Sequence, residues 1–194
     1  MKNAIKWYNS RCDMYLDFPK NGMGLELGVA KGLNSVNLYQ AARPKVLQLV
    51  DTWDDYNMGH QYIANKNEHW EPFEVGTSYE EYLANLYSKE IAEKTIITHK
   101  SDVFDFLSEV PDNSFDWVYV DDVHIYAHAK KELYEVIRVT KPNGIVAGHD
   151  FRILRRGWGL GPVAAVLEHV QEGSLEILGL SQEDWPSYMC KVKK

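Results

Sequence analysis

The stretch GLELGVAKGLNS, residues 24–35, decides the fold of this chain. An apolar run that carries one acid, Glu26, leads into a turn containing Gly28, Ala30 and Gly32, and a helix-compatible segment follows. A glycine-rich turn between a strand and a helix lets the backbone come close to a ligand and turns N–H groups toward it. The stretch therefore predicts a buried strand, a ligand-binding turn and a helix.

The alternation of strand-like and helix-like segments continues outward from this stretch. The strand-like segments are residues 24–29, 45–53, 95–100, 115–122, 144–151, 174–180 and 187–192. Apolar strands separated by helical segments are typical of a parallel sheet covered on both faces. The last two segments are too close for a helical crossover, so we expect them to form an antiparallel hairpin. We predict an α/β fold with a doubly wound, mostly parallel sheet of seven strands, including this antiparallel C-terminal hairpin.

Length and composition fit one domain. The 194 residues, of which 45% are hydrophobic and 25% charged, can bury a single sizeable core. We expect a single domain over residues 1–194. Within it, we expect residues 1–22 to form an N-terminal helical segment. Residues 54–76, which are polar and aromatic, break the alternation and are interpreted as an insertion in a loop.

The charge and the cysteines limit the partners and the compartment. A net charge of -7 gives the chain no general attraction to nucleic acid or to an anionic membrane. Cys12 and Cys190 lie near opposite ends and in no metal-binding spacing, which is typical of a reducing compartment. Charged and amide residues occur throughout the N-terminal segment, which is unlike the apolar core of a signal peptide. No later apolar run is long enough to span a membrane. We expect a cytoplasmic protein that binds neither nucleic acid nor membranes.

The spacing of the glycines narrows the choice of ligand. A dinucleotide-binding turn needs the spacing G-x-G-x-x-G, but counting from Gly28 the chain has Ala30 and Leu33 at the other two positions. A phosphate-binding loop needs a Gly-Lys-Ser/Thr ending, which GVAKGLNS lacks. What remains is the pattern acid-x-Gly-x-small-x-Gly, from Glu26 to Gly32.

This pattern resembles the first motif of class I S-adenosylmethionine-dependent methyltransferases, and further segments resemble their later motifs in the same order. These segments are LVDTW (49–53), KSDVFDFL (100–107), PDNSFDWVYVDDVHIYAHAKKEL (111–133), KPNGIVAGHDF (141–151) and GPVAAV (161–166). The last three are similar to small-molecule O-methyltransferases of the sugar and catechol type. The resemblance covers roughly residues 22–192 and implies a Rossmann-like fold.

The resemblance implies S-adenosylmethionine as cofactor. The binding residues that it implies are Glu26, Gly28, Gly32, Asp51, Ser101, Asp102, Val103 and Asp121. In that arrangement the acid of the first motif holds the amino group, Asp51 accepts from both ribose hydroxyls, and Asp102 accepts from the adenine amino group. The Val103 N–H would reach a ring nitrogen. Two alternatives stay open: the glycines serve tight strand–helix packing, and Asp51 is a helix cap or a solvated acid.

Two acids indicate a metal at the reacting end of the site, which is the part where the methyl group would be transferred to the acceptor. Asp121 and Asp150 stand at the ends of two neighbouring predicted strands, and they match two metal-ligand acids of metal-dependent O-methyltransferases. Carboxylate oxygens suit Mg²⁺, which would orient an acceptor hydroxyl and lower its pKa. Those enzymes carry another Asp or Asn where this chain has Phe151, and DDVH at 121–124 displaces one acid of their D-G-D-H pattern. A metal-free site, in which Asp121 orients the cofactor or the substrate, is the alternative.

His124 and His149 are the candidate general bases, because an imidazole can accept a proton near neutral pH. Together with Asp121 they make up the predicted catalytic set. A lone histidine is more often a structural hydrogen-bonding residue, and that alternative stays open for both. The other histidines have no partner spacing and are interpreted as surface or core residues: His60, His69, His99, His128 and His169.

Two segments are expected to shape the acceptor site. RILRRGWGLG (152–161) places Arg152, Arg155 and Arg156 after the last parallel strand. Arginines can grip a carboxylate or a phosphate bidentately, so this loop is interpreted as a clamp for an anionic acceptor, with a solvated basic loop as the alternative. The insertion at 54–76 is either a lid over the acceptor or a passive loop.

We predict an S-adenosylmethionine-dependent methyltransferase that methylates an oxygen of a small polar, sugar-like acceptor. Oxygen is favoured over nitrogen because DDVH stands where amide and amine methylases carry Asp/Asn-Pro-Pro-aromatic. It is favoured over carbon because cytosine C5 methylation needs a cysteine nucleophile just after this strand, and neither Cys12 nor Cys190 lies there. The alternatives are a nucleotide-cofactor oxidoreductase on a similar fold and a non-catalytic S-adenosylmethionine-binding module. The expected partner is the small-molecule acceptor, and a homodimer is one alternative for the oligomeric state.

Overall fold

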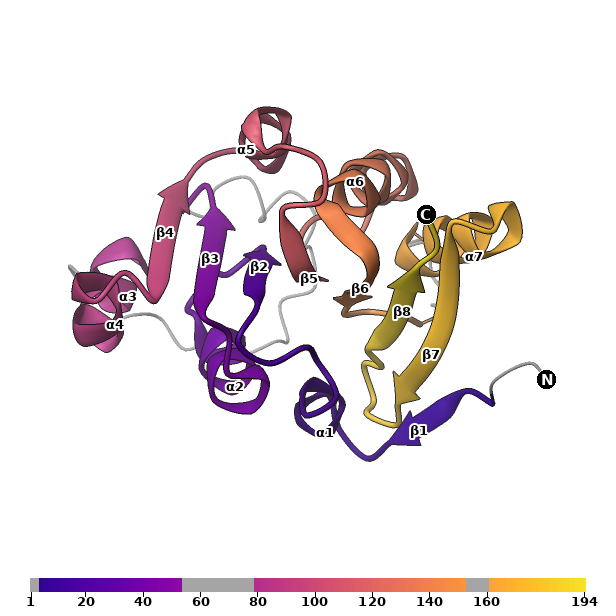
Figure 1. Cartoon of the computed structure of the whole chain (residues 1–194), viewed down its shortest axis with the longest axis horizontal. Coiled ribbons are helices and arrows are strands. Elements are labelled where there is room, and N and C mark those ends of the chain that lie inside the picture. Colours follow the sequence, from indigo (N-terminus) through magenta and orange to yellow (C-terminus); the bar gives the residue numbers. More distant parts are fainter. Residues whose placement is uncertain (1–3, 54–78, 153–160) are drawn as a thin grey trace, which may run out of the picture.

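The computed structural model describes residues 4–53, 79–152 and 161–194. Within these residues the chain forms one sheet of eight strands in the order β1-β7-β8-β6-β5-β2-β3-β4 (Figure 1). The strands are β1 (Lys6–Tyr8), β2 (Met23–Leu27), β3 (Val46–Asp51), β4 (Ile96–Lys100), β5 (Phe115–Val120), β6 (Thr140–Gly148), β7 (Leu175–Ser181) and β8 (Tyr188–Val192). The insertion predicted at 54–76 lies outside the described residues.

The predicted α/β fold with a doubly wound, mostly parallel sheet is confirmed. The pairs among β2, β3, β4, β5 and β6 are all parallel. Strand β8 is antiparallel to both β6 and β7, which confirms the C-terminal hairpin. The predicted number of seven strands is wrong by one, because β1 lies in the segment 1–22 that was expected to be helical and pairs in parallel with β7. At three mostly exposed residues, β1 carries no apolar pattern that could predict it.

Helices cover both faces of the sheet (Figure 1). They are α1 (Arg11–Tyr15), α2 (Leu33–Ala42), α3 (Tyr79–Leu86), α4 (Ser88–Ala92), α5 (Val103–Glu109), α6 (Tyr126–Val139) and α7 (Gly161–Glu172). Helices α5, α6 and α7 pack on one face, and α1, α2 and α3 pack on the other. Among the helices in the described ranges, none is both long enough and apolar enough to cross a membrane.

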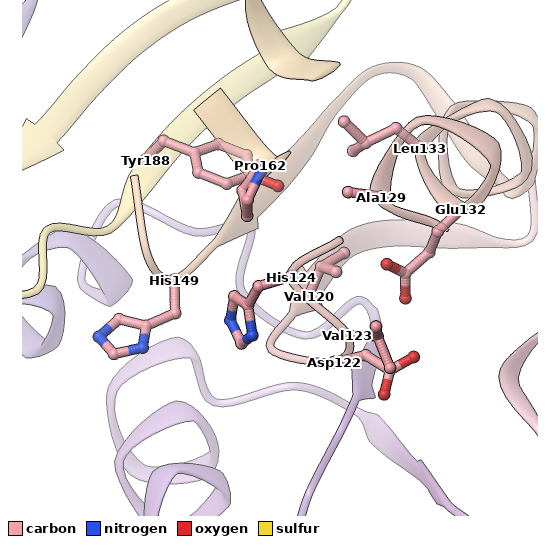
Figure 2. Close-up of a pocket in the computed structure, with 10 residues that line it drawn as sticks. All are labelled: Val120, Asp122, Val123, His124, Ala129, Glu132, Leu133, His149, Pro162 and Tyr188. Atoms are coloured by element: carbon pink, nitrogen blue, oxygen red, sulfur yellow. The ribbon is translucent and has the colours of Figure 1, made fainter. Parts of the chain in front are cut away.

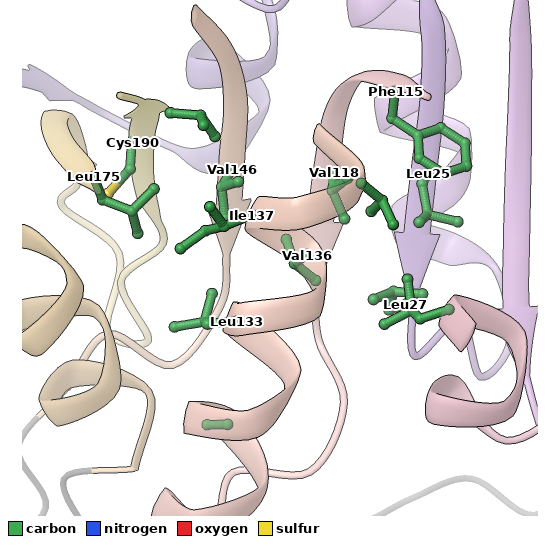
Figure 3. Packing of buried hydrophobic residues seen from close by; sticks show 14 of the residues in the cluster. Leu25, Leu27, Phe115, Val118, Leu133, Val136, Ile137, Val146, Leu175 and Cys190 are labelled. Carbon is green, nitrogen blue, oxygen red and sulfur yellow. The ribbon is translucent and has the colours of Figure 1, made fainter. Parts of the chain in front are cut away.

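Side chains of β5 alternate between the two faces, as the pleat of a strand requires. Val118 belongs to the cluster under α6, together with Leu25 and Val136 (Figure 3). Trp117 and Tyr119 belong to the cluster on the opposite face, which includes residues of α1 and α2. The core therefore consists of two apolar layers with the sheet between them.

The order of the strands reverses at β2, since β3 pairs with one edge of it and β5 with the other. In doubly wound sheets, ligands bind beyond the carboxyl ends of the strands at such a point. Backbone hydrogen bonds continue past these ends: Gly28 N–H donates to Val50 O at 3.0 Å, and Asp121 N–H donates to Leu27 O at 2.8 Å. The turn after β2 and the loop after β5 are therefore held side by side.

Candidate functional site

The turn after β2 requires glycine for two reasons. Gly28 and Gly32 have φ values of 78° and 71°, in the left-handed region that favours glycine. A Cβ on Gly28 would lie 2.2 Å from the carbonyl oxygen of Asp121, and a Cβ on Gly32 would lie 2.2 Å from the Leu83 side chain. Close packing therefore accounts for both glycines, and their contact with a cofactor stays a prediction.

Asp51, at the end of β3, holds this turn in place by hydrogen bonds. Its Oδ2 accepts hydrogen bonds from the N–H groups of Val29 and Ala30, both at 2.8 Å, and its Oδ1 accepts from the Trp53 N–H at 2.9 Å. The Trp53 indole in turn donates to Ala30 O at 3.1 Å. A carboxylate offers about four acceptor positions, so with respect to the described residues one position on Oδ1 is left for a further donor. Asp51 is therefore a fixed acceptor beside the turn, which differs from both a helix cap and a solvated acid.

Glu26, on β2, is fully buried next to the turn. Asn34 Nδ2 donates to its Oε1 at 2.9 Å and the Ser35 hydroxyl donates to its Oε2, both from the start of α2. Burial raises the pKa of Glu26 to about 8; the two hydrogen bonds oppose this shift, and the charges of Asp121 and Asp51 reinforce it. Without a cation nearby, this acid is therefore largely protonated at neutral pH.

The start of α5 holds the three residues predicted for the adenine end. Asp102 caps the helix, since its Oδ1 accepts from Phe104 N–H at 2.8 Å and from Asp105 N–H at 3.3 Å. Ser101 Oγ donates to Asp102 O at 2.9 Å. Val103 is the first residue of the helix, where an N–H has no acceptor within the helix. The segment therefore presents a backbone donor beside a capping carboxylate.

The four residues predicted for the reacting end come together at the ends of β5 and β6. The Nε2 atom of His124 contacts Asp150 Oδ2 and lies 3.8 Å from Asp121 Oδ1. The Nδ1 atom of His149 lies 3.6 Å from Asp121 Oδ1 and 3.4 Å from Asp150 Oδ1. The two imidazoles therefore lie close to the same two carboxylates, and His124 forms a hydrogen bond with Asp150.

Burial and charge set the ionisation of this group. Burial lowers the pKa of His124, but the hydrogen bond and charge of Asp150 outweigh it, so the pKa lies above its ordinary value. Burial raises the pKa of Asp150, but the hydrogen bond from His124 outweighs it, so this pKa lies below its ordinary value. The buried Nε2 atom of His149 has no hydrogen-bond partner in the described part of the chain. His124 and Asp150 therefore form a hydrogen-bonded acid–base pair.

Arg11, on α1, belongs to this neighbourhood although no sequence pattern singles it out. Its Nε atom lies 3.4 Å from Glu183 Oε1, and its charge acts on Asp121 and Asp150. Burial raises the pKa of Asp150, and Arg11 adds to the effect of His124 in lowering it. Because Arg11 is far from these acids in the sequence, only the packing of α1 against the sheet brings them together.

The predicted arginine clamp is described only in part. Arg152 Nη1 donates to Asp184 O at 2.9 Å, and its guanidinium carbon lies 5.1 Å from the centroid of the Trp185 ring. Both partners lie between β7 and β8, so Arg152 is bound to the loop of the hairpin. Arg155 and Arg156 lie outside the described residues.

A second group of charged side chains lies between α6 and the loop after β5. His128 Nε2 lies 2.9 Å from Asp122 Oδ2, and Glu132 projects from the next turn of α6. One oxygen or nitrogen atom from each of the three lies within 4.8 Å of the other two. His128 has no partner spacing in the sequence, because only the folding of the loop toward the helix brings Asp122 to it.

A small cavity borders both groups (Figure 2). Its volume of ≈ 20 Å³ is room for about one water molecule or ion, and Asp122, Glu132, His124 and His149 are among the residues that line it. Glu132 is 1% exposed, and its Oε1 has no hydrogen-bond partner within the described ranges. Burial raises the pKa of Glu132 well above its ordinary value, and the charges of Asp122 and Asp102 add to this effect.

A family model described as a methyltransferase domain matches residues 25–151 of this chain. No curated protein matches the sequence significantly.

Solved methyltransferase structures resemble the fold. The N-methyltransferase NodS from Bradyrhizobium japonicum aligns with a TM-score of 0.60 and 13% identity, over 95% of each chain. The 1,6-didemethyltoxoflavin-N1-methyltransferase from Burkholderia thailandensis aligns with a TM-score of 0.60 and 10% identity, over 93% of this chain and 74% of that one. A protein assigned as a sarcosine dimethylglycine methyltransferase from Galdieria sulphuraria aligns with a TM-score of 0.57 and 15% identity. The alignment covers 85% of this chain but only 58% of the Galdieria sulphuraria chain. At such identities the likeness shows the fold alone.

Proposed function

Because the chain belongs to a family of methyltransferase domains, we propose that it transfers a methyl group from S-adenosylmethionine to an oxygen of a small polar acceptor. The observation that carries this proposal is the hydrogen bond between His124 and Asp150, which lie just beyond the carboxyl ends of β5 and β6. Methyl transfer to a hydroxyl needs in-line placement and the removal of a proton. An imidazole bonded to a carboxylate is suited to remove that proton.

The groups around the glycine turn fit S-adenosylmethionine in their chemistry. Glu26 is a buried acid that an ammonium group would keep ionised, and Asp51 Oδ1 has an acceptor position left for a ribose hydroxyl. Asp102 and the Val103 N–H would pair with the edge of adenine. When bound, S-adenosylmethionine supplies a methyl group activated by a positively charged sulfur. The Burkholderia thailandensis structure holds both S-adenosylhomocysteine and a small-molecule acceptor, which supports this class of ligands.

In the proposed mechanism His124 is the general base. Its Nε2 atom is bonded to Asp150, so Nδ1 is the atom that accepts the proton of the acceptor hydroxyl. Asp150 fixes the ring and stabilises the imidazolium that forms, and Asp121, 3.8 Å from Nε2, favours the same charge. His149, which faces both acids, is the second candidate base.

The residues do not fit Mg²⁺ as the agent of methyl transfer. Mg²⁺ prefers an octahedral set of oxygen ligands. Here the two carboxylates face two imidazoles, which offer nitrogen, and the residue after Asp150 is Phe151, whose side chain offers no oxygen. We therefore propose the metal-free alternative, in which Asp121 positions the reacting groups.

We propose further that the acceptor carries a negative group. Arg11 brings positive charge close to the two acids of the reacting end. Arg152, Arg155 and Arg156 lie shortly after Asp150 in the sequence. Arginine pairs bidentately with carboxylates and phosphates. A sugar acid or a nucleotide-linked sugar has both the hydroxyl to be methylated and the anion to be gripped.

Formation of S-adenosylhomocysteine, measured with neutral sugars, sugar acids and nucleotide-linked sugars as acceptors, tests the proposal. Asp150→Asn should lower turnover about 100-fold or more, because the base loses its partner, while calorimetry still detects S-adenosylhomocysteine binding. Asp112→Asn is the matched control, since Asp112 pairs with Arg138 at the opposite end of β5. Full turnover by both Asp150→Asn and His124→Gln would refute the mechanism. Thermal stabilisation by NAD and not by S-adenosylhomocysteine would favour an oxidoreductase.

A further inference from the structure

Three side chains outside the proposed methyl-transfer machinery converge beside the loop after β5. His128 and Glu132 are one turn apart on α6 and therefore project from the same face of the helix. Asp122 comes from the loop, and its Oδ2 lies 2.9 Å from His128 Nε2. One nitrogen or oxygen atom from each of the three lies within 4.8 Å of the others. Loop and helix thus present three ligand groups to one point.

Glu132 is the member of this group that needs a partner. It is 1% exposed, its Oε1 accepts no hydrogen bond from the described residues, and its carboxylate points toward the loop that carries Asp122 and Val123 (Figure 2). Asp122 and Asp102 place further negative charge close to it. A buried carboxylate without a partner is costly, and either a proton or a cation neutralises it. The cavity that Asp122 and Glu132 border has a volume of ≈ 20 Å³, enough for about one ion.

We propose that Asp122, His128 and Glu132 bind a divalent transition-metal ion, with Zn²⁺ as the reference ion. One imidazole and two carboxylates match the nitrogen and oxygen ligands of Zn²⁺, whereas Mg²⁺ and Ca²⁺ prefer oxygen ligands. In a tetrahedral set, metal–ligand bonds of about 2.0–2.2 Å place neighbouring ligand atoms roughly 3.3–3.6 Å apart. The 2.9 Å between Asp122 Oδ2 and His128 Nε2 is a hydrogen-bond distance, so these atoms need to separate by only about 0.5 Å to share an ion, and rotation of the Glu132 side chain would complete the set.

The ion would join the loop after β5 to α6. This loop also carries Asp121 and His124, so the ion would hold the reacting end in place without touching the acceptor. The His128 ring packs on Phe104, with ring centroids 4.9 Å apart, and this contact fixes the direction of its nitrogen atoms. The inference goes beyond the proposed function, because it concerns the stability of this loop whichever acceptor is methylated.

Calorimetry with ZnCl₂ on chelator-treated protein, with the zinc content measured after dialysis, tests the site. The wild type should bind one zinc ion per chain and melt at a higher temperature. Glu132→Gln and His128→Gln should each weaken binding by more than the roughly 10–100-fold that loss of an outer-shell partner costs. Glu135→Gln is the matched control on the same helix, since Glu135 pairs with Arg138, and it should bind zinc like the wild type. Asp150→Asn, which alters the neighbouring cluster, should also bind zinc like the wild type.

Unchanged zinc affinity in both Glu132→Gln and His128→Gln would overturn the proposal. Loss of zinc binding in Asp150→Asn but not in Glu132→Gln would also overturn it, because the ion would then belong to the neighbouring cluster. A wild-type protein that takes up no zinc would overturn it as well. If Glu132→Gln does not fold, His128→Gln decides the question, since that side chain is partly exposed. None of these readouts needs methyl transfer, so failure of the proposed function is distinguishable from failure of this site.

Discussion

The buried acid of β2 allows the electrostatics of the site to be tested without an acceptor. Burial raises the pKa of Glu26 to about 8, from an ordinary value of 4.5. Between these two values the folded protein holds a proton that the unfolded chain releases, so stability falls as the pH rises. The contribution of this proton is fully present below pH 4.5 and is lost as the pH rises through about 8. Glu26→Gln keeps the shape of the side chain and removes the titration, since the Ser35 hydroxyl can turn from donor to acceptor.

The magnitude follows from the two pKa values. Their difference of about 3.5 corresponds to roughly 4–5 kcal/mol across this pH range, or about 1.4 kcal/mol per pH unit on the steep part. Glu26 is fully buried, so solvent does not screen the effect. Urea unfolding at pH values between about 5 and 8 measures it as the difference between wild type and variant. Glu93→Gln, at an exposed position, is the control and should follow the wild type. Parallel pH curves for wild type and Glu26→Gln would refute the reasoning.

The same titration should couple to the cofactor. If Glu26 holds the amino group, the ammonium ion of S-adenosylhomocysteine stabilises the ionised acid, so binding releases a proton and tightens as the pH rises toward 8. Glu26→Gln should lose affinity and also lose this pH dependence. Calorimetry in buffers of different ionisation enthalpy counts the released proton. Proton release that persists in the variant would assign the amino group to another acid.

Other changes separate packing from binding and from metal dependence. Gly28→Val should lower the melting temperature by several degrees or prevent folding, because even its Cβ would lie 2.2 Å from the Asp121 carbonyl oxygen, and a wild-type melting curve would contradict this. Asp51→Ala should weaken S-adenosylhomocysteine binding by about 1–3 kcal/mol in calorimetry, and unchanged affinity would remove Asp51 from the cofactor site. Combining Arg155→Ala with Arg156→Ala should raise the KM of an anionic acceptor but not that of S-adenosylmethionine; equal KM values would dismiss the clamp. Added Mg²⁺ should leave the initial rate unchanged, and a higher rate would restore the metal-dependent mechanism.

The frame of the site could be predicted because parallel strands bring their last residues to one edge. Gly28, Asp51, Asp121 and Asp150 each stand at the end of an apolar strand or just after it, and the pairing of β3 with β2, β2 with β5 and β5 with β6 places those ends side by side. The prediction needed only the rule that the carboxyl ends of such strands meet where the strand order reverses. It did not need the position of any single side chain.

Residues that reach the site by other routes could not be predicted. Arg11 arrives because α1 packs on the face of the sheet that also holds Tyr119, and a five-residue helix carries too short a pattern to reveal its buried side. The role of the glycines is ambiguous for another reason. Gly28 satisfies a left-handed turn and a close backbone contact, and both needs produce the same letter in the sequence as a contact with a cofactor. The structure shows the turn and the close contact, and the contact with a cofactor stays a prediction.

The adjacent acids Asp121 and Asp122 belong to one sequence motif but point to opposite sides of the sheet. Neighbouring residues of a strand point to opposite faces, and Tyr119 faces the layer of α1 whereas Val118 faces the layer of α6. Continued past the end of β5, this alternation directs Asp121 to the side of Tyr119 and Asp122 to the side of Val118. Asp121 accordingly lies in the reacting cluster, and Asp122 lies 2.9 Å from His128 of α6. The two acids of DDVH therefore belong to different groups of side chains, because the pleat of the strand directs them to opposite sides.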